Sequence, residues 1–259
     1  ILRIPPLGFA NALDHFCGDW MAHPQALTLI CGMAGSAQGW QLAPYMACPS
    51  PLQNLTQHLV WVQNQKVALV PGIACELAHA PDVMRGEETQ VLGLTDGSYS
   101  GLVVTPGTHS KWIRFEDDRI RNFRTFMTGE LFAAVRSGTV LGDEMGDPGL
   151  DMSAFEDGVR RSLADRALTA ILFSVRAQRL SGILSPASMA DYLSGLLIGA
   201  EIAAQDKVFD RTITVVGPPA LNDRYVAALA MAGFEDVQVL DANRATARGL
   251  WRIHQEHLT

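Results

Sequence analysis

Three segments of the chain combine glycine with side chains that can donate, accept or carry charge. They are Cys31-Gly-Met-Ala-Gly-Ser-Ala-Gln-Gly-Trp40, Val83-Met-Arg-Gly-Glu-Glu-Thr-Gln90 and Thr105-Pro-Gly-Thr-His-Ser-Lys-Trp112. Each segment adjoins a predicted strand or helix. Glycine lets a ligand approach the backbone closely, and functional loops often lie at the ends of regular elements. These three segments are therefore the first candidates for a binding or catalytic site.

The third segment could hold a phosphate group. It connects two predicted strands, so Gly107 and Thr108 are expected in a tight hairpin whose N–H groups and hydroxyl face the ligand. Lys111 adds a positive charge nearby. The alternative is an ordinary structural turn, because glycine is a common turn residue. For an isolated Gly-Thr pair the structural turn is the more frequent case, so both interpretations stay open.

The second segment places two carboxylates at a predicted helix N-terminus. Glu87 and Glu88 follow Gly86, and either could accept a proton from an attacking hydroxyl. The alternative is that they only offset the helix dipole, a contribution of about 0.3–1 kcal/mol. Arg85 beside them could bind an anion or serve as a surface ion-pair partner.

The first segment is expected to follow a buried strand and to form a ligand loop. Ser36 and Gln38 would supply hydrogen bonds, and Trp40 would form an apolar wall. The alternative is a glycine-rich connection with a tryptophan in the core.

The overall composition excludes several classes of function. The chain carries 20 Lys+Arg against 27 Asp+Glu, a net charge of −7, and its basic residues are scattered. Nucleic acid is therefore not an expected partner. No apolar run approaches the roughly 18 residues that span a bilayer, so no membrane partner is expected. The four cysteines form no C-x-x-C pair, which favours reduced thiols in the cytoplasm.

Several common motifs of catalysis and cofactor binding are missing from the sequence. It contains no P-loop, dinucleotide, zincin or hydrolase-elbow motif. Of its histidines, only His109 lies inside one of the three segments.

The alternation of apolar runs with helical patterns predicts an α/β protein. In the first hundred residues we expect helices over 9–20 and from 86, and strands over 26–31 and 67–70. Three consecutive strands follow, over 102–105, 111–115 and 120–126, the last two joined by a charged turn. We place a domain boundary near Gly101, giving domains of residues 1–100 and 101–259.

The second half continues with helices, strands and a helical insertion at about 140–185. The expected helices cover 130–136, 153–180, 188–204, 222–232 and the segment from 242, and the expected strands cover 212–216 and 237–240. In the helix over 188–204, Gly195 and Gly199 lie four residues apart on one face. That helix is expected to approach another backbone closely.

Five longer strings resemble one enzyme family over essentially the whole chain. They are Gly32–Trp40, Asp82–Gln90, Pro106–Trp112, Met127-Thr-Gly-Glu-Leu-Phe132 and Tyr192-Leu-Ser-Gly-Leu-Leu-Ile-Gly-Ala-Glu201. Together they resemble the 2-dehydro-3-deoxygalactonokinase family. The resemblance implies the sugar kinase, actin and heat-shock ATPase superfold, an actin-like, ribonuclease H-like architecture of two domains that close over ATP.

The resemblance implies roles for the residues of the three segments. Glu87 corresponds to the catalytic base, with Glu88 as the reserve. The expected phosphate-binding residues are Gly107, Thr108, His109, Ser110 and Lys111, and the string Val215-Val-Gly-Pro-Pro219 resembles the adenosine-binding turn through Gly217. Arg85 is expected to bind the substrate carboxylate, with Ser36, Gln38 and Trp40 lining the sugar-acid site in the N-terminal domain.

The implied reaction is ATP-dependent phosphorylation of 2-dehydro-3-deoxy-D-galactonate to its 6-phosphate in galactonate catabolism, with Mg²⁺ as cofactor. The alternatives are a kinase for another keto-deoxy sugar acid or an aldonate, and a non-catalytic ATP-binding module on the same fold. The magnesium ligands stay unassigned, and a homo-oligomer is one alternative for the assembly.

One element of the family pattern has no counterpart in this sequence. Family members begin with a strand carrying Asp-Trp-Gly and then Thr or Ser, the first phosphate hairpin, and this string does not occur here. We therefore expect the N-terminal hairpin to lie upstream of Ile1.

Overall fold

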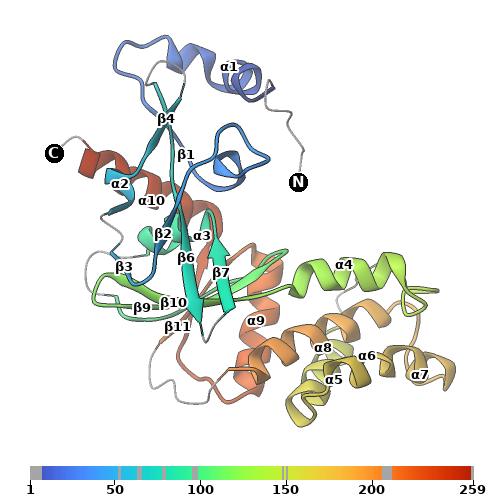
Figure 1. The fold of residues 1–259 in the computed structure, drawn as a ribbon. Helices are drawn as coiled ribbons and strands as arrows, with labels where there is room; N and C mark the ends of the chain where they lie inside the picture. The colour runs from blue at the N-terminus through green and yellow to red at the C-terminus, as the bar shows by residue number, and fades with distance from the viewer. Residues whose placement is uncertain are drawn as a thin grey trace. The chain divides into compact units, whose positions relative to one another are not determined.

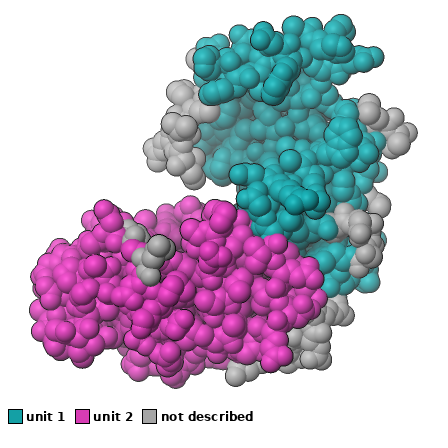
Figure 2. All heavy atoms as spheres, turned by 180° about the vertical axis from the view of Figure 1, so that it is seen from behind, with its two compact units in different colours: residues 1–103, 111–124, 240–259 teal, residues 104–110, 125–239 magenta. Residues whose placement is uncertain are grey.

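The computed structural model describes residues 8–51, 54–62, 66–77, 80–94, 99–147, 149, 151–205 and 212–257. The chain divides into two compact units, which Figure 2 shows in two colours. Unit 1 comprises Ile1–Val103, Lys111–Arg124 and Leu240–Thr259, and unit 2 comprises Val104–Ser110 and Thr125–Val239. The first segment of unit 1 ends close to the expected boundary near Gly101, and two later segments join it. The functional division into domains 1–100 and 101–259 stays a prediction.

Unit 1 contains two mixed three-stranded sheets (Figure 1). In the first, β5 (Val67–Leu69) pairs in parallel with β1 (Thr28–Ile30) and antiparallel with β4 (Val60–Val62). In the second, β6 (Gly72–Leu77) pairs in parallel with β2 (Tyr45–Ala47) and antiparallel with β7 (Ala80–Met84). All three residues of β5 are buried, as expected for an apolar central strand.

Unit 1 also contains five helices among the described residues. They are α1 (Gly8–Met21), the 3-10 helix η1 (Gly32–Gly35), α2 (Asn54–Gln57), α3 (Glu87–Leu92) and α10 (Ala242–His257). Phe9 and Leu13 of α1 pack on the cluster that contains Val67 and Leu69. The backbones of α3 and α10 cross closely: a Cβ on Gly249 would lie 1.9 Å from the carbonyl oxygen of Thr89. Glycine is therefore required at this crossing.

A six-stranded sheet contains the three consecutive strands that the sequence predicts. Its order is β12 (Val237–Asp241), β11 (Ile213–Gly217), β8 (Gly101–Thr105), β9 (Ser110–Glu116), β10 (Arg119–Phe126) and β3 (Ser50–Pro51). The charged turn between β9 and β10 is confirmed. Asp117 and Asp118 have φ of 51° and 56°, the positive values that a two-residue type I′ hairpin turn needs.

The helices of unit 2 gather around α8 (Figure 1). They are α4 (Thr128–Gly138), α5 (Met152–Ala164), α6 (Leu168–Leu172), α7 (Ser174–Leu180), α8 (Met189–Ala203) and α9 (Pro219–Met231). The single helix expected over 153–180 is wrong, because three helices cover that segment. Asp165, after α5, has φ −141° and ψ 115°, an extended conformation that ends the helix.

The close approach predicted for the helix over 188–204 is confirmed. A Cβ on Gly195 would lie 2.0 Å from the carbonyl oxygen of Phe155, and one on Gly158 would lie 2.3 Å from that of Tyr192. The backbones of α5 and α8 are therefore in direct contact. Almost every residue of α8 is buried, which is typical of a helix at the centre of a core.

The sequence reading missed β2, β3, β4, β6, β7 and α2. The missed elements are short, two to six residues each, and glycine and proline occur among them. Their pairing is set by neighbouring strands rather than by a local hydrophobic period.

Candidate active site

Gly86 joins the acidic segment to the first glycine-rich loop in unit 1. Its φ is 112°, a conformation that side chains disfavour, and a Cβ there would lie 3.3 Å from Cα of Gly32. Glycine at this position lets the chain turn from β7 into α3 while the loop at Gly32 packs against it. Two of the three segments identified in the sequence therefore lie together.

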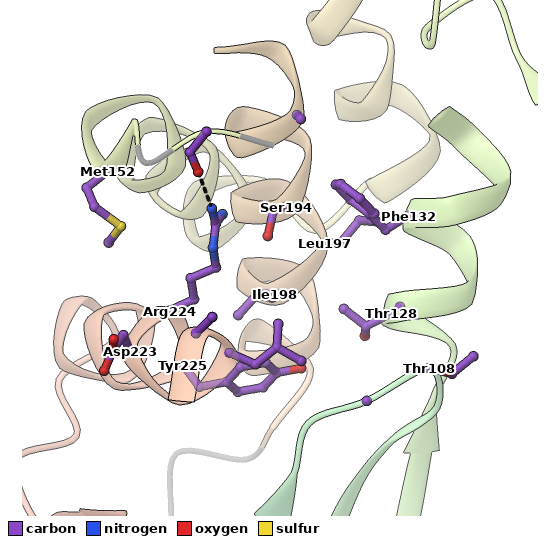
Figure 3. A pocket seen from close by; sticks show the side chains of 16 residues that line it. Thr108, Thr128, Phe132, Met152, Ser194, Leu197, Ile198, Asp223, Arg224 and Tyr225 are labelled. Atoms are coloured by element: carbon purple, nitrogen blue, oxygen red, sulfur yellow. Dashed lines mark hydrogen bonds between the residues drawn. The ribbon is translucent and has the colours of Figure 1, made fainter. Parts of the chain in front are cut away.

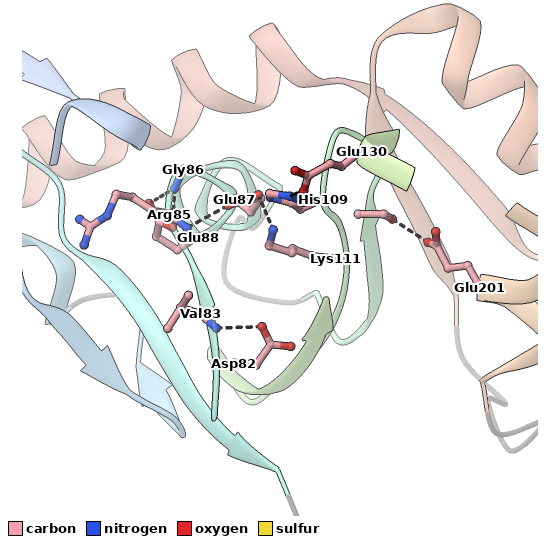
Figure 4. Close-up of polar contacts among 11 residues, drawn as sticks. Asp82, Val83, Arg85, Gly86, Glu87, Glu88, His109, Lys111, Glu130 and Glu201 are labelled. Atoms are coloured by element: carbon pink, nitrogen blue, oxygen red, sulfur yellow. Dashed lines mark hydrogen bonds and ion pairs between the residues drawn. The ribbon is translucent and has the colours of Figure 1, made fainter. Parts of the chain in front are cut away.

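The Glu88 side chain is fully buried at the start of α3. The Gly86 N–H donates to its two carboxyl oxygens at 2.8 and 2.7 Å, and the Thr89 hydroxyl donates at 3.1 Å (Figure 4). Burial, and next the charge of Glu87, raise the pKa of Glu88 to about 8. This environment favours the protonated form of the Glu88 carboxyl group at neutral pH.

Glu87 keeps 21% of its side chain exposed and is paired with a cation. Its Oε1 lies 3.3 Å from Nζ of Lys111, and its Oε2 accepts a hydrogen bond from the Arg85 N–H at 3.0 Å (Figure 4). Lys111 is itself buried. This ion pair stabilises a negative charge on the more accessible of the two carboxylates.

Arg85 carries hydrogen-bond donors that the described residues do not use. Its Nη2 donates to the Ala43 carbonyl at 2.7 Å, and its guanidinium lies 4.3 Å from the Tyr45 ring centroid. Nε and Nη1 are buried and have no hydrogen-bond partner among the residues that the structure describes. A Cβ on Gly35 would lie only 2.9 Å from Nη1. An arginine with unused donors beside a glycine loop is suited to bind a carboxylate.

The three substrate-loop candidates lie in different surroundings. The Ser36 hydroxyl is buried and has no hydrogen-bond partner within the described ranges, and it follows Gly35 directly. Gln38 is exposed. Trp40 stacks on Phe9 with ring centroids 5.9 Å apart and packs against the unit 1 core, which was the structural alternative for this residue.

A cysteine that the sequence reading left aside also lies at this site. Burial, and then the charge of Glu88, raise the pKa of the Cys31 thiol to about 11. The thiol is therefore neutral at physiological pH. In the sequence, the only sign of a role for Cys31 is that it directly precedes Gly32 in the first segment.

Unit 2 contains a cavity of about 900 Å³ (Figure 3). Gly107 and Thr108 of the β8–β9 loop line it, together with the start of α4 and parts of α8 and α9. Much of the wall is apolar, as at Phe132, Leu197 and Ile198. This volume is typical of a small-molecule site. The sequence reading missed these wall residues, although Phe132 and Leu197 belong to two of the family strings.

The start of α4 packs against the β8–β9 loop. The Glu130 N–H donates to the Thr108 carbonyl at 2.9 Å, and a Cβ on Gly129 would lie 2.4 Å from the Gly107 carbonyl oxygen. His109 contributes a second link, since its Nε2 lies 2.5 Å from Glu130 Oε2. By contrast, a Cβ on Gly107 would meet no atom within 4 Å. The loop is held from one side, and Gly107 itself faces open space.

The remaining nucleotide candidates lie around this loop. Gly217, at the end of β11, lies next to it, because a Cβ there would be 3.2 Å from Cδ of Pro106. The Asn222 side chain donates to the Gly217 carbonyl at 2.9 Å and so fixes the turn into α9. Ser110 is fully buried, and its hydroxyl donates to Glu201 at 2.6 Å instead of lining the cavity. Lys111 pairs with Glu87, as described above.

The described residues contain neither a cluster of potential metal ligands nor a helix that could span a membrane. No group of three or more His, Cys, Asp or Glu side chains in these ranges could hold a metal ion. No described helix is long and apolar enough to cross a membrane.

Comparison with known proteins identifies the family. A family model described as 2-keto-3-deoxy-galactonokinase matches residues 1–253. The chain is 39% identical over 254 residues to a Rhizobium meliloti (strain 1021) protein named as a 2-dehydro-3-deoxygalactonokinase, covering 94% of this chain and 82% of that protein. It is 35% identical over 246 residues to the 2-dehydro-3-deoxygalactonokinase of Escherichia coli (strain K12), covering 94% and 83%.

A solved structure agrees with these matches. The crystal structure of a 2-dehydro-3-deoxygalactonokinase protein from Sinorhizobium meliloti superposes with a TM-score of 0.89 at 38% identity, covering 96% of this chain and 86% of that one. The α/β fold with mixed sheets is therefore shared along almost the whole chain. This chain belongs to the 2-keto-3-deoxy-galactonokinase family, a family of carbohydrate kinases.

Proposed function

We propose that this carbohydrate kinase transfers the γ-phosphoryl group of ATP to the terminal hydroxyl of 2-keto-3-deoxygalactonate and forms the 6-phosphate in galactonate catabolism. The observation that carries the proposal is that Nε and Nη1 of Arg85 have no hydrogen-bond partner among the described residues, while Nη1 lies 2.9 Å from where a Cβ on Gly35 would be. A sugar acid differs from a neutral sugar by its carboxylate, and a partly buried arginine whose Nε and Nη1 are unpaired among the described residues can recognise that group.

The sugar acid binds in the glycine-rich part of unit 1. Its carboxylate accepts hydrogen bonds from Nε and Nη1 of Arg85, and the Ser36 hydroxyl donates to a neighbouring oxygen of the substrate. Gln38 is exposed and can contact the substrate through its amide. Trp40 contributes mainly by holding the loop through its contact with Phe9.

Glu87 serves as the general base. A base must reach the hydroxyl whose proton it accepts, and Glu87 is the carboxylate of this pair that keeps exposed surface. Glu88 is fully buried and already protonated at neutral pH, so it stays the reserve. Lys111 holds Glu87 in place through their ion pair and balances its charge.

ATP binds in the unit 2 cavity. The backbone N–H groups of the loop at Gly107, Thr108 and His109 face its phosphate groups, as donors do in other phosphate-binding loops. The first turn of α4 adds the positive end of a helix dipole. The adenosine part lies along the apolar wall near the turn at Gly217.

Magnesium, when bound to ATP, neutralises charge on the phosphate oxygens. It needs only one or two carboxylates from a protein, because phosphates and water complete its shell. The absence of a three-residue cluster in the described ranges is therefore compatible with Mg²⁺, and its ligands stay unassigned.

The broader architecture in this proposal is the two-domain superfold of sugar kinases, actin and heat-shock ATPases, in a cytoplasmic enzyme. What supports it is the element order from β8 onward, three strands followed by helices that alternate with β11 and β12. Family membership over residues 1–253 adds to this support.

The decisive experiment compares Arg85→Gln and Arg85→Lys with an exposed control, Arg166→Gln. Loss of a charge-assisted pair should raise the KM for the sugar acid by roughly 10- to 100-fold and leave the KM for ATP unchanged. The same assay with the substrate's carboxamide separates charge from shape. The wild-type enzyme should lose affinity for the amide, whereas Arg85→Gln should discriminate little between acid and amide.

Two outcomes would contradict this assignment. An unchanged KM for the sugar acid in Arg85→Gln would remove Arg85 from the site. A panel of keto-deoxy acids and aldonates tests the substrate itself, and turnover of another acid at a higher kcat/KM would replace the galactonate assignment.

A further inference from the structure

Glu201, in the last turn of α8, is a buried carboxylate that the proposed reaction does not use. Only 2% of the residue is exposed. Ser110 donates to its Oε1 at 2.6 Å, Tyr225 donates to its Oε2 at 2.9 Å, and the Thr128 hydroxyl also donates to Oε2. Tyr225 in turn lies 3.2 Å from the Ser110 hydroxyl oxygen. One carboxylate on α8 thus accepts from three hydroxyl groups of unit 2, which come from Ser110, the start of α4 and α9.

The three donors belong to elements that border the cavity. Ser110 begins β9 and ends the loop that carries Gly107 and Thr108. Thr128 begins α4 and precedes Gly129, whose backbone packs on the Gly107 carbonyl. Tyr225 is on α9, and Thr128 and Tyr225 both line the cavity (Figure 3). Glu201 therefore connects the end of the loop, the start of α4 and the α9 wall through its hydrogen bonds.

We propose that Glu201 is a positioning residue that fixes the Gly107–Thr108 loop and the start of α4 in the geometry that binds nucleotide phosphates. The inference rests on the proposed function, because it takes this loop to be the phosphate site. It explains two family strings without an assigned role, since Met127–Phe132 supplies Thr128 and Tyr192–Glu201 supplies the carboxylate itself.

The physical reason is the cost of burying a carboxylate. A buried charge is tolerated only where donors satisfy its oxygens, so Glu201 constrains each hydroxyl that it accepts from. Burial and the nearby Glu201 raise the pKa of Tyr225 well above its usual range, so the Tyr225 hydroxyl keeps its proton and donates. Replacing one carboxylate oxygen by an amide nitrogen, which cannot accept, would keep the packing but remove the acceptor of at least one of these hydroxyls.

The test combines nucleotide kinetics with hydrogen exchange in the full chain. Glu201→Gln keeps the side-chain shape, and Tyr225→Phe removes only the hydroxyl. Each should raise the KM for ATP by about tenfold, since hydrogen bonds to charged groups contribute strongly. Each should leave the KM for the sugar acid within about twofold. Amide exchange in peptides covering 106–110 and 127–130 should become faster.

Conservative variants separate the hydroxyl from the packing. Thr128→Val should behave like Tyr225→Phe, whereas Thr128→Ser should restore both the exchange rate and the KM for ATP. The matched control is Ser162→Ala, because Ser162 is equally buried in unit 2 and donates to the Leu196 carbonyl at 2.6 Å, away from the loop. It should lower thermal stability without changing the KM for ATP.

The outcomes distinguish the positioning role of Glu201 from the assignment of the loop as the phosphate site. Unchanged exchange at 106–110 in Tyr225→Phe and Thr128→Val would overturn the positioning role of Glu201, even if Glu201→Gln fails to fold. Faster exchange with an unchanged KM for ATP would overturn the phosphate assignment of the loop instead. An equal rise in both KM values would also overturn the inference, because it would indicate general loss of structure.

Discussion

Two buried acidic side chains, Glu88 in unit 1 and Glu201 in unit 2, satisfy their carboxyl oxygens in different ways. Glu88 accepts from the Gly86 N–H and the Thr89 hydroxyl, and a second carboxylate, Glu87, adjoins it. Glu201 accepts from three hydroxyls, which are 24 to 91 residues away along the chain. Burial and the charge of Glu87 raise the pKa of Glu88. Around Glu201, the hydroxyls of Ser110, Thr128 and Tyr225 each donate a hydrogen bond to a carboxyl oxygen.

This difference suggests different roles: the Glu87–Glu88 pair takes part in the reaction, whereas Glu201 positions other groups. The Glu88 site is local and leaves its neighbour Glu87 partly exposed, so a substrate hydroxyl can reach it. The partners of Glu201 are far from it in the sequence, and Glu201 itself is buried, so a substrate cannot reach it. Its effect on the reaction must therefore act through the loop that ends at Ser110 and through the start of α4. Variants in unit 1 should therefore change kcat or sugar-acid binding, and variants in unit 2 should change ATP binding.

The largest effect is expected at Glu87. Glu87→Gln should lower kcat by about 100-fold or more, because it removes the proton acceptor, with little change in ATP affinity. Steady-state kinetics together with calorimetric titration of ATP measure the two quantities separately.

Glu88→Gln is the matched variant for this prediction. It should cost much less kcat, because Glu88 is protonated and has no exposed surface. A larger loss in Glu88→Gln than in Glu87→Gln would place the base one residue later. Near-wild-type turnover in both variants would remove the base from this segment.

A smaller effect is expected at the unit 2 loop. Gly107→Val should raise the KM for ATP by about tenfold and leave sugar-acid binding without nucleotide intact. The fold should tolerate the change, because a Cβ at Gly107 meets no atom within 4 Å and its φ is not positive. The added methyl groups would instead occupy the space through which phosphate approaches the backbone.

Gly138→Val is the control for Gly107→Val. Gly138 is exposed at the end of α4, and a Cβ there also meets no atom within 4 Å. This variant should keep the wild-type KM for ATP. If Gly107→Val weakens both ligands equally, the loop serves a mixed site or the fold itself is disturbed.

The sequence was sufficient for the local structure of those candidate-site segments that depend on neighbouring residues. The turn at Gly86, the acidic start of α3 and the loop at Gly107 all follow from short strings. The charged turn at Asp117 and Asp118 also follows from these residues and their flanking strands. Local backbone preference decides such features, so they can be predicted without long-range contacts.

The parts that failed depend on tertiary contacts. Nothing near Glu201 in the sequence indicates that its partners are Ser110, Thr128 and Tyr225. Likewise, the break at Asp165 divides a segment whose helical pattern is continuous, and β6 forms because β2 and β7 flank it. The stacking of Trp40 on Phe9, thirty-one residues earlier, likewise leaves no trace in the local pattern. Such contacts override local patterns.

The last prediction concerns stability, because the environment of Glu88 should couple folding to pH. The folded protein raises the pKa of Glu88 from its ordinary value of 4.5 to about 8. Below pH 4.5 both the folded and the unfolded states carry the proton, so the stabilising contribution is complete. Between pH 4.5 and 8 only the folded state keeps it, and the free energy of unfolding falls as pH rises, by at most about 1.4 kcal/mol per pH unit from this group.

Glu88→Gln should flatten the decline between pH 5 and 8 in urea unfolding, whereas the exposed control Glu235→Gln should retain it. Identical slopes for wild-type protein and Glu88→Gln would mean that Glu88 is ionised in the folded state, and the argument that favours Glu87 as the base would then rest on exposure alone.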